Sequence, residues 1–256
     1  MILTVDVGNS NIVLAVFSGE KVFKKWRIVT DKTTSKEEYE TVLVQLMRFN
    51  DCNKNIIDGI VYGSVVPEVD DNLLNALKFL NKKIINVGDK NTKLNLKVRK
   101  EIKDELIGQD IVVNIIAGKK KFKENFIIID MGTATTFDVA LTDGEYAGSV
   151  IAPGAKLGSN ALHTFCSQLP EVEIKKPEKV LGTNTEVLMQ SGLYYGYIGL
   201  IKEIVEQIKR EYKNINFKIY ITGGLSVVFI HDLKFVDGFC PNLTSEGLNE
   251  VWYINK

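Results

Sequence analysis

Two short glycine-containing segments of similar composition lie in the two halves of the chain, and their residue types suit phosphate binding. They are Asp6-Val7-Gly8-Asn9-Ser10-Asn11 and Asp130-Met131-Gly132-Thr133-Ala134-Thr135-Thr136. Glycine lets the backbone approach an anion closely, and the neighbouring amides and hydroxyls can donate hydrogen bonds to it. Aspartate can hold a metal ion directly or through a bound water. Two such turns facing each other across a cleft would clamp a nucleoside triphosphate.

Each segment is flanked by apolar runs that predict β-strands, so each is expected to be the turn of a hairpin. Residues 2–5 precede the first segment and 12–17 follow it, while 126–129 precede the second. A single Asp-and-Gly turn would be ordinary hairpin chemistry. The repetition of the pattern after a comparable strand favours the phosphate-binding interpretation.

Two further segments could carry chemistry. Gly108-Gln109-Asp110 lies where a polar loop enters a predicted helix, and the helix dipole favours a carboxylate there. Asp110 is either an ordinary acidic residue of the first turn or a general base that accepts a proton from a hydroxyl. Gly223-Gly224 follows a strand and either lets the backbone approach a flat ligand such as adenine or forms a simple strand-to-helix turn.

The elements expected to position these residues alternate between strands and helices. Strands are predicted at 2–7, 12–17, 21–28, 59–66, 83–87, 126–130, 135–142, 145–151, 217–222 and 233–236. Helices are predicted from a capping box at Ser35 and Glu38 and over 68–80, 109–117, 156–165, 184–212, 225–231 and 244–253. This order predicts an α/β fold, and the hairpins at the start of each half favour mixed sheets. A predicted loop at 118–125 divides the chain into domains 1–118 and 119–256.

Composition argues against several classes of protein. Thirty-two basic residues balance thirty-two acidic ones, so net charge gives no reason to expect binding to nucleic acid or to an anionic membrane. No apolar stretch reaches the roughly 18 residues of a membrane-spanning helix. The beginning of the chain lacks signal-peptide features, and its three scattered cysteines form no zinc pattern. These features predict a cytoplasmic protein.

Taken together, the motifs resemble the type III pantothenate kinases of bacteria, over nearly the whole chain. Besides the segments above, the resemblance rests on Ser64-Val65-Val66-Pro67, Phe137-Asp138, Ile151-Ala152-Pro153-Gly154, Leu169-Pro170, Gly182-Thr183-Asn184-Thr185 and Gln190-Ser191-Gly192. It implies duplicated actin-like (ribonuclease H-like) domains with mixed sheets flanked by helices. It also implies ATP-dependent phosphorylation of pantothenate, the first step of coenzyme A synthesis. Members of the family are homodimers with the pantothenate site near the interface, and they use Mg²⁺ and a monovalent cation, K⁺ or NH₄⁺.

The resemblance also implies roles for individual residues. The catalytic base would be Asp110, the monovalent cation would bind Asp130, and Mg²⁺ would bind Asp6 through water. The expected ATP contacts are Asp6, Val7, Gly8, Asn9, Ser10, Asn11, Ile12, Val13 and Thr133, to which the paired glycines add Gly223 and Gly224. The expected substrate contacts are Gly108, Gln109, Ile111 and Thr185.

The chain departs from the family at two positions of the substrate site. Ile111 stands where the family has an arginine, and Val98 stands where it has a tyrosine. Losing a charge-assisted hydrogen bond costs roughly 1.5–3 kcal/mol. Two alternatives therefore stay open: a nucleotide-binding homologue with weak or no kinase activity that acts through a partner, and a kinase for a related small alcohol. Positive charge from Arg99, Lys100 or Lys103 could compensate for the missing arginine.

Overall fold

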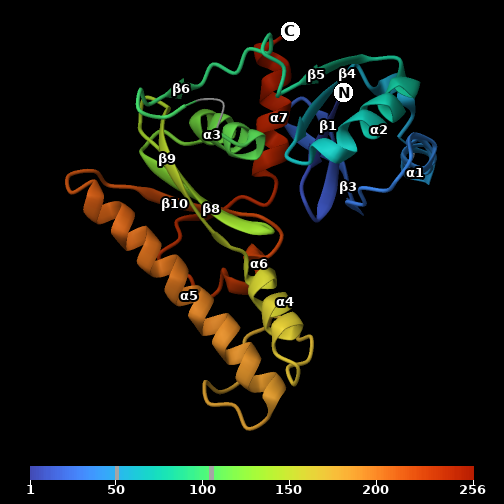
Figure 1. The fold of residues 1–256 in the computed structure, drawn as a ribbon. Coiled ribbons are helices and arrows are strands. Elements are labelled where there is room, and N and C mark those ends of the chain that lie inside the picture. The colour runs from blue at the N-terminus through green and yellow to red at the C-terminus, as the bar shows by residue number, and fades with distance from the viewer. Residues whose placement is uncertain (50–51, 104–106) are drawn as a thin grey trace. The chain divides into compact units, whose positions relative to one another are not determined.

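The computed structural model describes residues 1–49, 52–103 and 107–256, which form two compact units (Figure 1). Unit 1 comprises Met1–Lys97, Glu101–Lys121 and Asn242–Lys256. Unit 2 comprises Val98–Lys100 and Phe122–Pro241. The end of the chain thus belongs to the same unit as its beginning. That 1–118 and 119–256 act as separate domains stays a prediction.

Unit 1 is built on a five-stranded mixed sheet with the order β3-β2-β1-β4-β5. Its strands are β1 (Ile2–Val7), β2 (Asn11–Ser18), β3 (Lys21–Val29), β4 (Gly59–Ser64) and β5 (Lys83–Asn86). The first three form an antiparallel meander, and β4 and β5 add to β1 in parallel. Because β1 and β4 are parallel, both end at the same edge of the sheet.

Helices cover both faces of this sheet. The helices of unit 1 are α1 (Lys36–Phe49), α2 (Pro67–Leu77), α3 (Gln109–Lys121) and α7 (Leu243–Ile254), with short 3₁₀ turns η1 (Lys54–Ile56) and η2 (Lys78–Leu80). Side chains alternate along β1, so Leu3 and Val5 pack in one core with Leu43 of α1 and Leu73 of α2. On the other face, the core contains Ile2 and residues of α3 and α7.

Two predicted helix starts in unit 1 are confirmed. The side chain of Glu38 accepts a hydrogen bond from the Ser35 amide at 2.7 Å, and the Ser35 hydroxyl accepts one from the Glu38 amide at 3.3 Å. This reciprocal pair is the predicted capping box. Pro67 precedes the helix predicted over 68–80 and is well placed to start it, and α2 does begin at Pro67, whose missing N–H costs nothing in the first turn.

Unit 2 repeats the same strand order. Its strands are β6 (Lys97–Val98, shared at its first residue with unit 1), β7 (Phe126–Met131), β8 (Ala134–Ala140), β9 (Glu145–Pro153), β10 (Lys218–Thr222) and β11 (Gly238–Phe239). The series β9-β8-β7-β10-β11 matches β3-β2-β1-β4-β5, with antiparallel pairing on one side of the central strand and parallel pairing on the other. The duplication expected from the sequence is therefore present in the topology.

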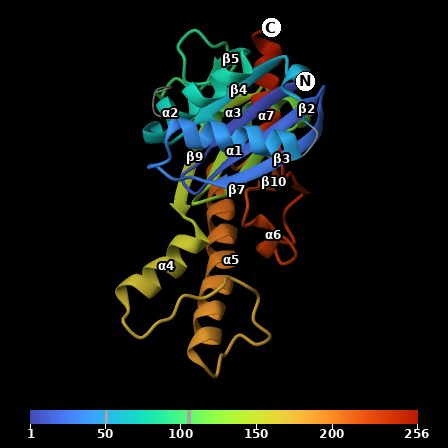
Figure 2. The same ribbon diagram turned by 90° about the vertical axis from the view of Figure 1, so that its right-hand side faces the viewer.

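The helices of unit 2 are α4 (Ala155–Phe165), α5 (Thr185–Glu211) and α6 (Ser226–Phe229). The C-terminal part of α5 packs in the core of the unit through Ile201, Val205 and Ile208. Its N-terminal part runs beyond the sheet beside α4, as Figures 1 and 2 show. Asn184 caps α5 by accepting a hydrogen bond from the Val187 amide at 3.0 Å.

Three sequence expectations are wrong. No strand forms over 233–236; instead, residues 238–239 pair with β10, held by the Asp237 side chain, which accepts from the Ile219 amide at 2.9 Å. The predicted loop at 118–125 is helical to Lys121, because Lys120 and Lys121 pair with Glu250 and Glu246 of α7 and lie at the favourable C-terminal end of the dipole. The predicted helix 184–212 also suggests an exposed apolar stripe that includes Leu188, Leu193, Ile198 and Ile201. This stripe does not extend to Ile201, which is fully buried.

None of the helices in the described part of the chain is long and apolar enough to cross a membrane.

Gly247 allows α7 to pack tightly against α3. A Cβ atom at this position would lie 2.0 Å from the carbonyl oxygen of Val113, so one helix would have to move. We expect Gly247→Ala to lower the free energy of unfolding by about 3 kcal/mol, at the upper end of the cost of overpacking. Gly158→Ala in α4 is the matched control, since its nearest neighbour would lie at an ordinary 3.5 Å. The control should be stabilised by about 0.5–1 kcal/mol. Chemical unfolding curves measure both, and equal effects would contradict the packing argument.

Candidate functional site

The turn after β1 is fixed by hydrogen bonds from two directions. The Gly8 amide donates to the Asn11 carbonyl at 3.0 Å, which closes the hairpin. From the end of β3, the Thr30 amide donates to the Ser10 carbonyl at 3.1 Å and the Thr30 hydroxyl donates to the Gly8 carbonyl at 2.6 Å. Asn9 and Ser10 are exposed. The backbone of this turn is therefore fixed, and its polar side chains face solvent.

The side chains of the predicted ATP-binding segment divide into two groups. Val7 and Ile12 are fully buried in the core, so they can offer a ligand only their backbone. Asp6 is partly exposed at the end of β1, where it lies opposite Val13 of β2 and Gly63 of β4. The carboxylate of Asp6 thus stands beside the turn rather than within it.

A chain of hydrogen bonds links this turn to the start of α3. The Val65 amide donates to the Val7 carbonyl at 3.0 Å, which ties β4 to the end of β1. The Ser64 amide donates to Oε1 of Gln109 at 3.0 Å. The other end of that amide fits against Gly88, where a Cβ would lie 2.6 Å from Nε2 of Gln109. Gln109 therefore anchors the first turn of α3 to the edge where β1 and β4 end, and its predicted contact with a substrate stays a prediction.

Asp110 follows this anchor and is held in a poorly solvated position. Its Oδ1 accepts from the Ile111 amide at 2.8 Å and lies 2.5 Å from where a Cβ of residue 108 would be, so Gly108 leaves room for this carboxylate position. Desolvation by burial raises the pKa of the Asp110 carboxyl above its ordinary value, against the opposing effect of the backbone amides. A carboxylate with a raised pKa is a better proton acceptor at neutral pH.

The residues expected to compensate for the missing arginine differ in how far their charge is already used. Ile111 is buried, and Val98 lies in the two-residue strand β6. Arg99 donates to the Tyr212 hydroxyl at 2.7 Å and lies 3.8 Å from a carboxylate oxygen of Glu145, so unit 2 already uses its charge. Lys100 and Lys103 are exposed.

The second turn has the same position in unit 2. The Gly132 amide donates to the Ala134 carbonyl at 3.0 Å, and Asp130 lies opposite Thr136 of β8 and Thr222 of β10. Gly223, with φ of +90°, lies so close that a Cβ there would be 2.6 Å from Oδ1 of Asp130. Gly223 is thus required both by its backbone conformation and by the space that the carboxylate occupies.

Of the other predicted site residues in unit 2, Thr133 and Gly224 lie near the second turn and Thr185 does not. The Thr133 carbonyl accepts from the Gly154 amide at 3.1 Å, which closes the turn from a second side, and Gly224 is exposed next to Gly223. Thr185 is the exposed first residue of α5, at the end of that helix distant from the sheet of unit 2 (Figures 1 and 2). Unit 2 alone therefore brings Asp130, Thr133 and Gly223 together and leaves Thr185 apart.

The sequence did not reveal which residues hold the turn after β1 and the start of α3 in place. Thr30 and the Gln109–Ser64 pair act through contacts across 22 and 45 residues respectively. No local pattern marks such partners. The only available signal was that Ser64 lies in an apolar run, 59–66, that predicts a strand.

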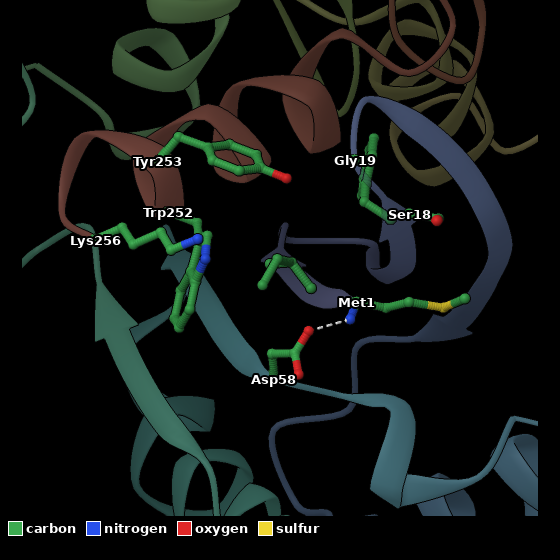
Figure 3. Close-up of a pocket in the computed structure, with 9 residues that line it drawn as sticks. Met1, Ser18, Gly19, Asp58, Trp252, Tyr253 and Lys256 are labelled. Carbon is green, nitrogen blue, oxygen red and sulfur yellow. Dashed lines mark hydrogen bonds and ion pairs between the residues drawn. The ribbon is translucent and has the colours of Figure 1, made fainter.

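A cavity of about 360 Å³ lies at the opposite end of β1 and is separate from this site. Figure 3 shows Trp252, Tyr253 and Lys256 on one side of it, with the amine of Met1 bonded to Asp58 on another. Met1 precedes the first residue of β1 and Asp6 lies near its end, so about 3.3 Å per residue places them roughly 16 Å apart. This cavity does not contain the residues predicted to carry chemistry.

Because burial raises the pKa of Asp110, ionising it opposes folding. The free energy of unfolding should fall as pH rises from the ordinary carboxyl pKa, about 3.9, through the raised value. Asp110→Asn cannot ionise, so we expect this variant to gain stability relative to the unaltered chain between pH 4 and 7.5. Asp71→Asn, at an exposed position of α2, is the matched control with little change. Urea unfolding at several pH values measures the difference, and a pH-independent difference for Asp110→Asn would contradict the burial argument.

Comparisons with known proteins agree with the fold and identify the family. A candidate Baf family transcriptional activator from Campylobacter jejuni has a similar structure, with a TM-score of 0.59, 18% identity and coverage of 99% of this chain and 98% of that one. A candidate 2-dehydro-3-deoxygalactonokinase from Sinorhizobium meliloti gives a TM-score of 0.60 at 11% identity, covering 100% and 99% of the two chains. The predicted fold class, duplicated and actin-like, is confirmed.

The family model covers most of the chain, and the relative described below covers all of it. The model of the family described as type III pantothenate kinase matches residues 2–207. A type III pantothenate kinase from Ruegeria sp. (strain TM1040) is 38% identical over 257 aligned positions, which cover 100% of this chain and 98% of that protein. The chain belongs to the type III pantothenate kinase family.

Proposed function

We propose that this protein transfers the γ-phosphoryl group of ATP to pantothenate, giving 4′-phosphopantothenate in the cytoplasm as the first step of coenzyme A synthesis. Family membership supports the reaction. The structural observation that carries it is Asp110, a carboxyl group with a raised pKa, tied through Gln109 and Ser64 to the Asp6 turn.

The reaction needs positioning and neutralisation of charge more than covalent chemistry by the protein. The primary hydroxyl oxygen of pantothenate attacks the γ-phosphorus, and the bond from that phosphorus to the bridging oxygen of ADP breaks. The hydroxyl proton passes to Asp110. The raised pKa of Asp110 suits this role because it brings the proton affinity of the carboxylate closer to working pH.

For ATP, the proposed contacts are the turn residues Asp6 to Val13 together with Thr133, Gly223 and Gly224. Burial of Val7 and Ile12 restricts their part to the backbone, and the exposed Asn9 and Ser10 supply side-chain donors. The positive φ of Gly223 supports a close approach of backbone to ligand at the second turn.

The residues fit the proposed ions. Among the described residues no group of three or more His, Cys, Asp or Glu side chains could hold a metal by itself. Mg²⁺ in phosphoryl transfer usually takes one or two carboxylates and completes its shell with water and phosphate oxygens, which suits Asp6. For K⁺ or NH₄⁺ we propose Asp130, whose carboxylate lies against the backbone of Gly223. Bound Mg²⁺ would neutralise charge on the phosphates.

The substrate contacts proposed are Gly108, Gln109, Ile111 and Thr185. Burial of Ile111 and the engagement of Arg99 by Tyr212 support a second candidate function, a kinase for a related alcohol without pantothenate's carboxylate. A homologue with little kinase activity that acts through a partner is the third reading of the same departures.

We also propose a homodimer with the active site near its interface. The arm formed by α4, the following loop and the start of α5 exposes large apolar side chains: Phe165 is 84% exposed, Leu181 86% and Leu188 57%. Open space lies beside Gly192, Gly196 and Gly199 of α5, which would allow another helix to approach closely. Exposed apolar patches of this kind are typical of interfaces.

Pantothenate-dependent release of ADP tests the proposed reaction. With ATP, Mg²⁺ and K⁺ supplied, we expect turnover that stops when Mg²⁺ is chelated and falls at least about 100-fold in Asp110→Asn, the usual contribution of a general base. Asp71→Asn on α2 should keep full activity. Turnover with pantetheine but not pantothenate would favour the related-alcohol kinase, and no turnover with either would contradict the kinase assignment.

Light scattering on the purified protein tests the dimer. We expect a dimer that Leu188→Glu converts to monomer, because a charge would be buried in an apolar contact. Val44→Glu, at a 43% exposed position of α1, is the control and should stay dimeric. A monomer in the unaltered chain, or a Leu188→Glu dimer, would refute this interface.

A further inference from the structure

Two basic side chains of β3 point from the same face of the unit 1 sheet as Asp6. Asp6 lies opposite Val13, and Val13 lies opposite Arg27, so these three residues form one row across three strands. Thr4, Ala15 and Lys25 form the next row. Directly opposed residues in antiparallel strands project from the same face, so Arg27 and Lys25 share the face of Asp6.

Arg27 and Lys25 are both exposed, but they differ in their contacts. No hydrogen bond or ion pair of Arg27 occurs among residues 1–49, 52–103 and 107–256. Lys25 instead donates to Oδ1 of Asn242, just before α7, at 2.8 Å. The pKa of Lys25 is lowered, first by desolvation and then by the positive charge of Arg27, while Asp6 opposes the shift. Two like charges are thus held near each other and near Asp6.

The strand that carries Arg27 is fastened to the turn after β1. Thr30, three residues beyond Arg27, bonds to Gly8 and Ser10 through its hydroxyl and amide. Neighbouring strands lie about 4.8 Å apart, which places the Cα atoms of Asp6 and Arg27 roughly 10 Å apart. An arginine side chain spans much of that distance, so its guanidinium can reach an anion bound beside the turn.

The duplicated unit shows that the fold does not require this charge. The corresponding row of unit 2 is Asp130, Thr136 and Ile151, and the next row ends in Ser149. Ile151 is 69% exposed, so packing does not demand a particular side chain at the position that corresponds to Arg27. A basic residue in one copy and an apolar one in the other indicate that the charge of Arg27 is not needed for packing.

We propose that Arg27 binds the β- and γ-phosphates of the nucleotide held at the Asp6 turn. This inference rests on the proposed function. The planar guanidinium can donate two parallel hydrogen bonds to phosphate oxygens, and the repulsion from Lys25 is relieved when a polyanion binds between them. Arg27 accordingly contacts the phosphates and leaves the adenosine to other residues.

Binding of ATP and of adenosine, measured by calorimetry with Mg²⁺ present, tests the role. Arg27→Ala should weaken ATP binding about ten- to a hundredfold, as expected for a charge-assisted hydrogen bond, and leave adenosine affinity unchanged. Arg27→Lys should recover part of the loss, because lysine keeps the positive charge but cannot donate two parallel hydrogen bonds. Lys24→Ala removes a charge from the opposite face of the same strand and serves as the matched control with unchanged affinities.

The outcomes separate this inference from the kinase assignment. Unchanged ATP affinity in Arg27→Ala, an equal loss of adenosine affinity, or an unaltered chain that binds ATP no better than adenosine would overturn the role of Arg27. If the unaltered chain binds ATP through Arg27 but phosphorylates no alcohol, the inference stands and the kinase assignment falls.

Discussion

The parallel pairing of β1 with β4 is the constraint on which the rest of unit 1 depends. Its register sets Asp6 opposite Gly63 and Val7 opposite Ser64, so both strands end at one edge of the sheet. The backbone groups left over at that edge must find partners. The Val7 carbonyl accepts a hydrogen bond from the Val65 amide, and the Ser64 amide donates one to the side chain of Gln109. The hydrogen bond from Ser64 to Gln109 holds the first turn of α3 at this edge of the sheet. Asp110, the next residue, is therefore held near the turn after β1.

Unit 2 repeats the pairing through β7 and β10 but fills its edge differently. Gly223 of unit 2 stands at the position that corresponds to Ser64 of unit 1. The carboxylate of Asp130 fills the space that a side chain at residue 223 would take. Unit 1 therefore places the carboxyl group of Asp110 on a helix and the guanidinium group of Arg27 on β3, while unit 2 places the carboxylate of Asp130 against the backbone of Gly223. The same topology thus presents different side chains at the two corresponding edges.

Much of this was predictable from local sequence. Hydrophobic patterns located the strands on either side of each turn, and Ser35 with Glu38 marked a helix start, because these signals depend on near neighbours. Together with the motifs, they led to the fold and the family, both confirmed. The long-range partners were not predictable: Gln109 meets Ser64, and α7 returns to pack against α3, only after folding. The strand expected at 233–236 failed for the same reason, since a side-chain bond from Asp237 to β10 selects residues 238–239 instead.

The central proposal is that the turn after β1 and the turn after β7 each take part in binding the nucleotide. Amide hydrogen exchange of the whole chain, with and without a non-hydrolysable ATP analogue and Mg²⁺, tests it most directly. Exposed amides that bind phosphate should exchange more slowly in the complex, because opening then requires release of the ligand. The account predicts the largest protection in two separate segments, Asp6–Asn11 and Asp130–Thr136, in the same titration range. Protection of only one turn, or protection centred on the cavity beside Met1 and Trp252, would contradict it.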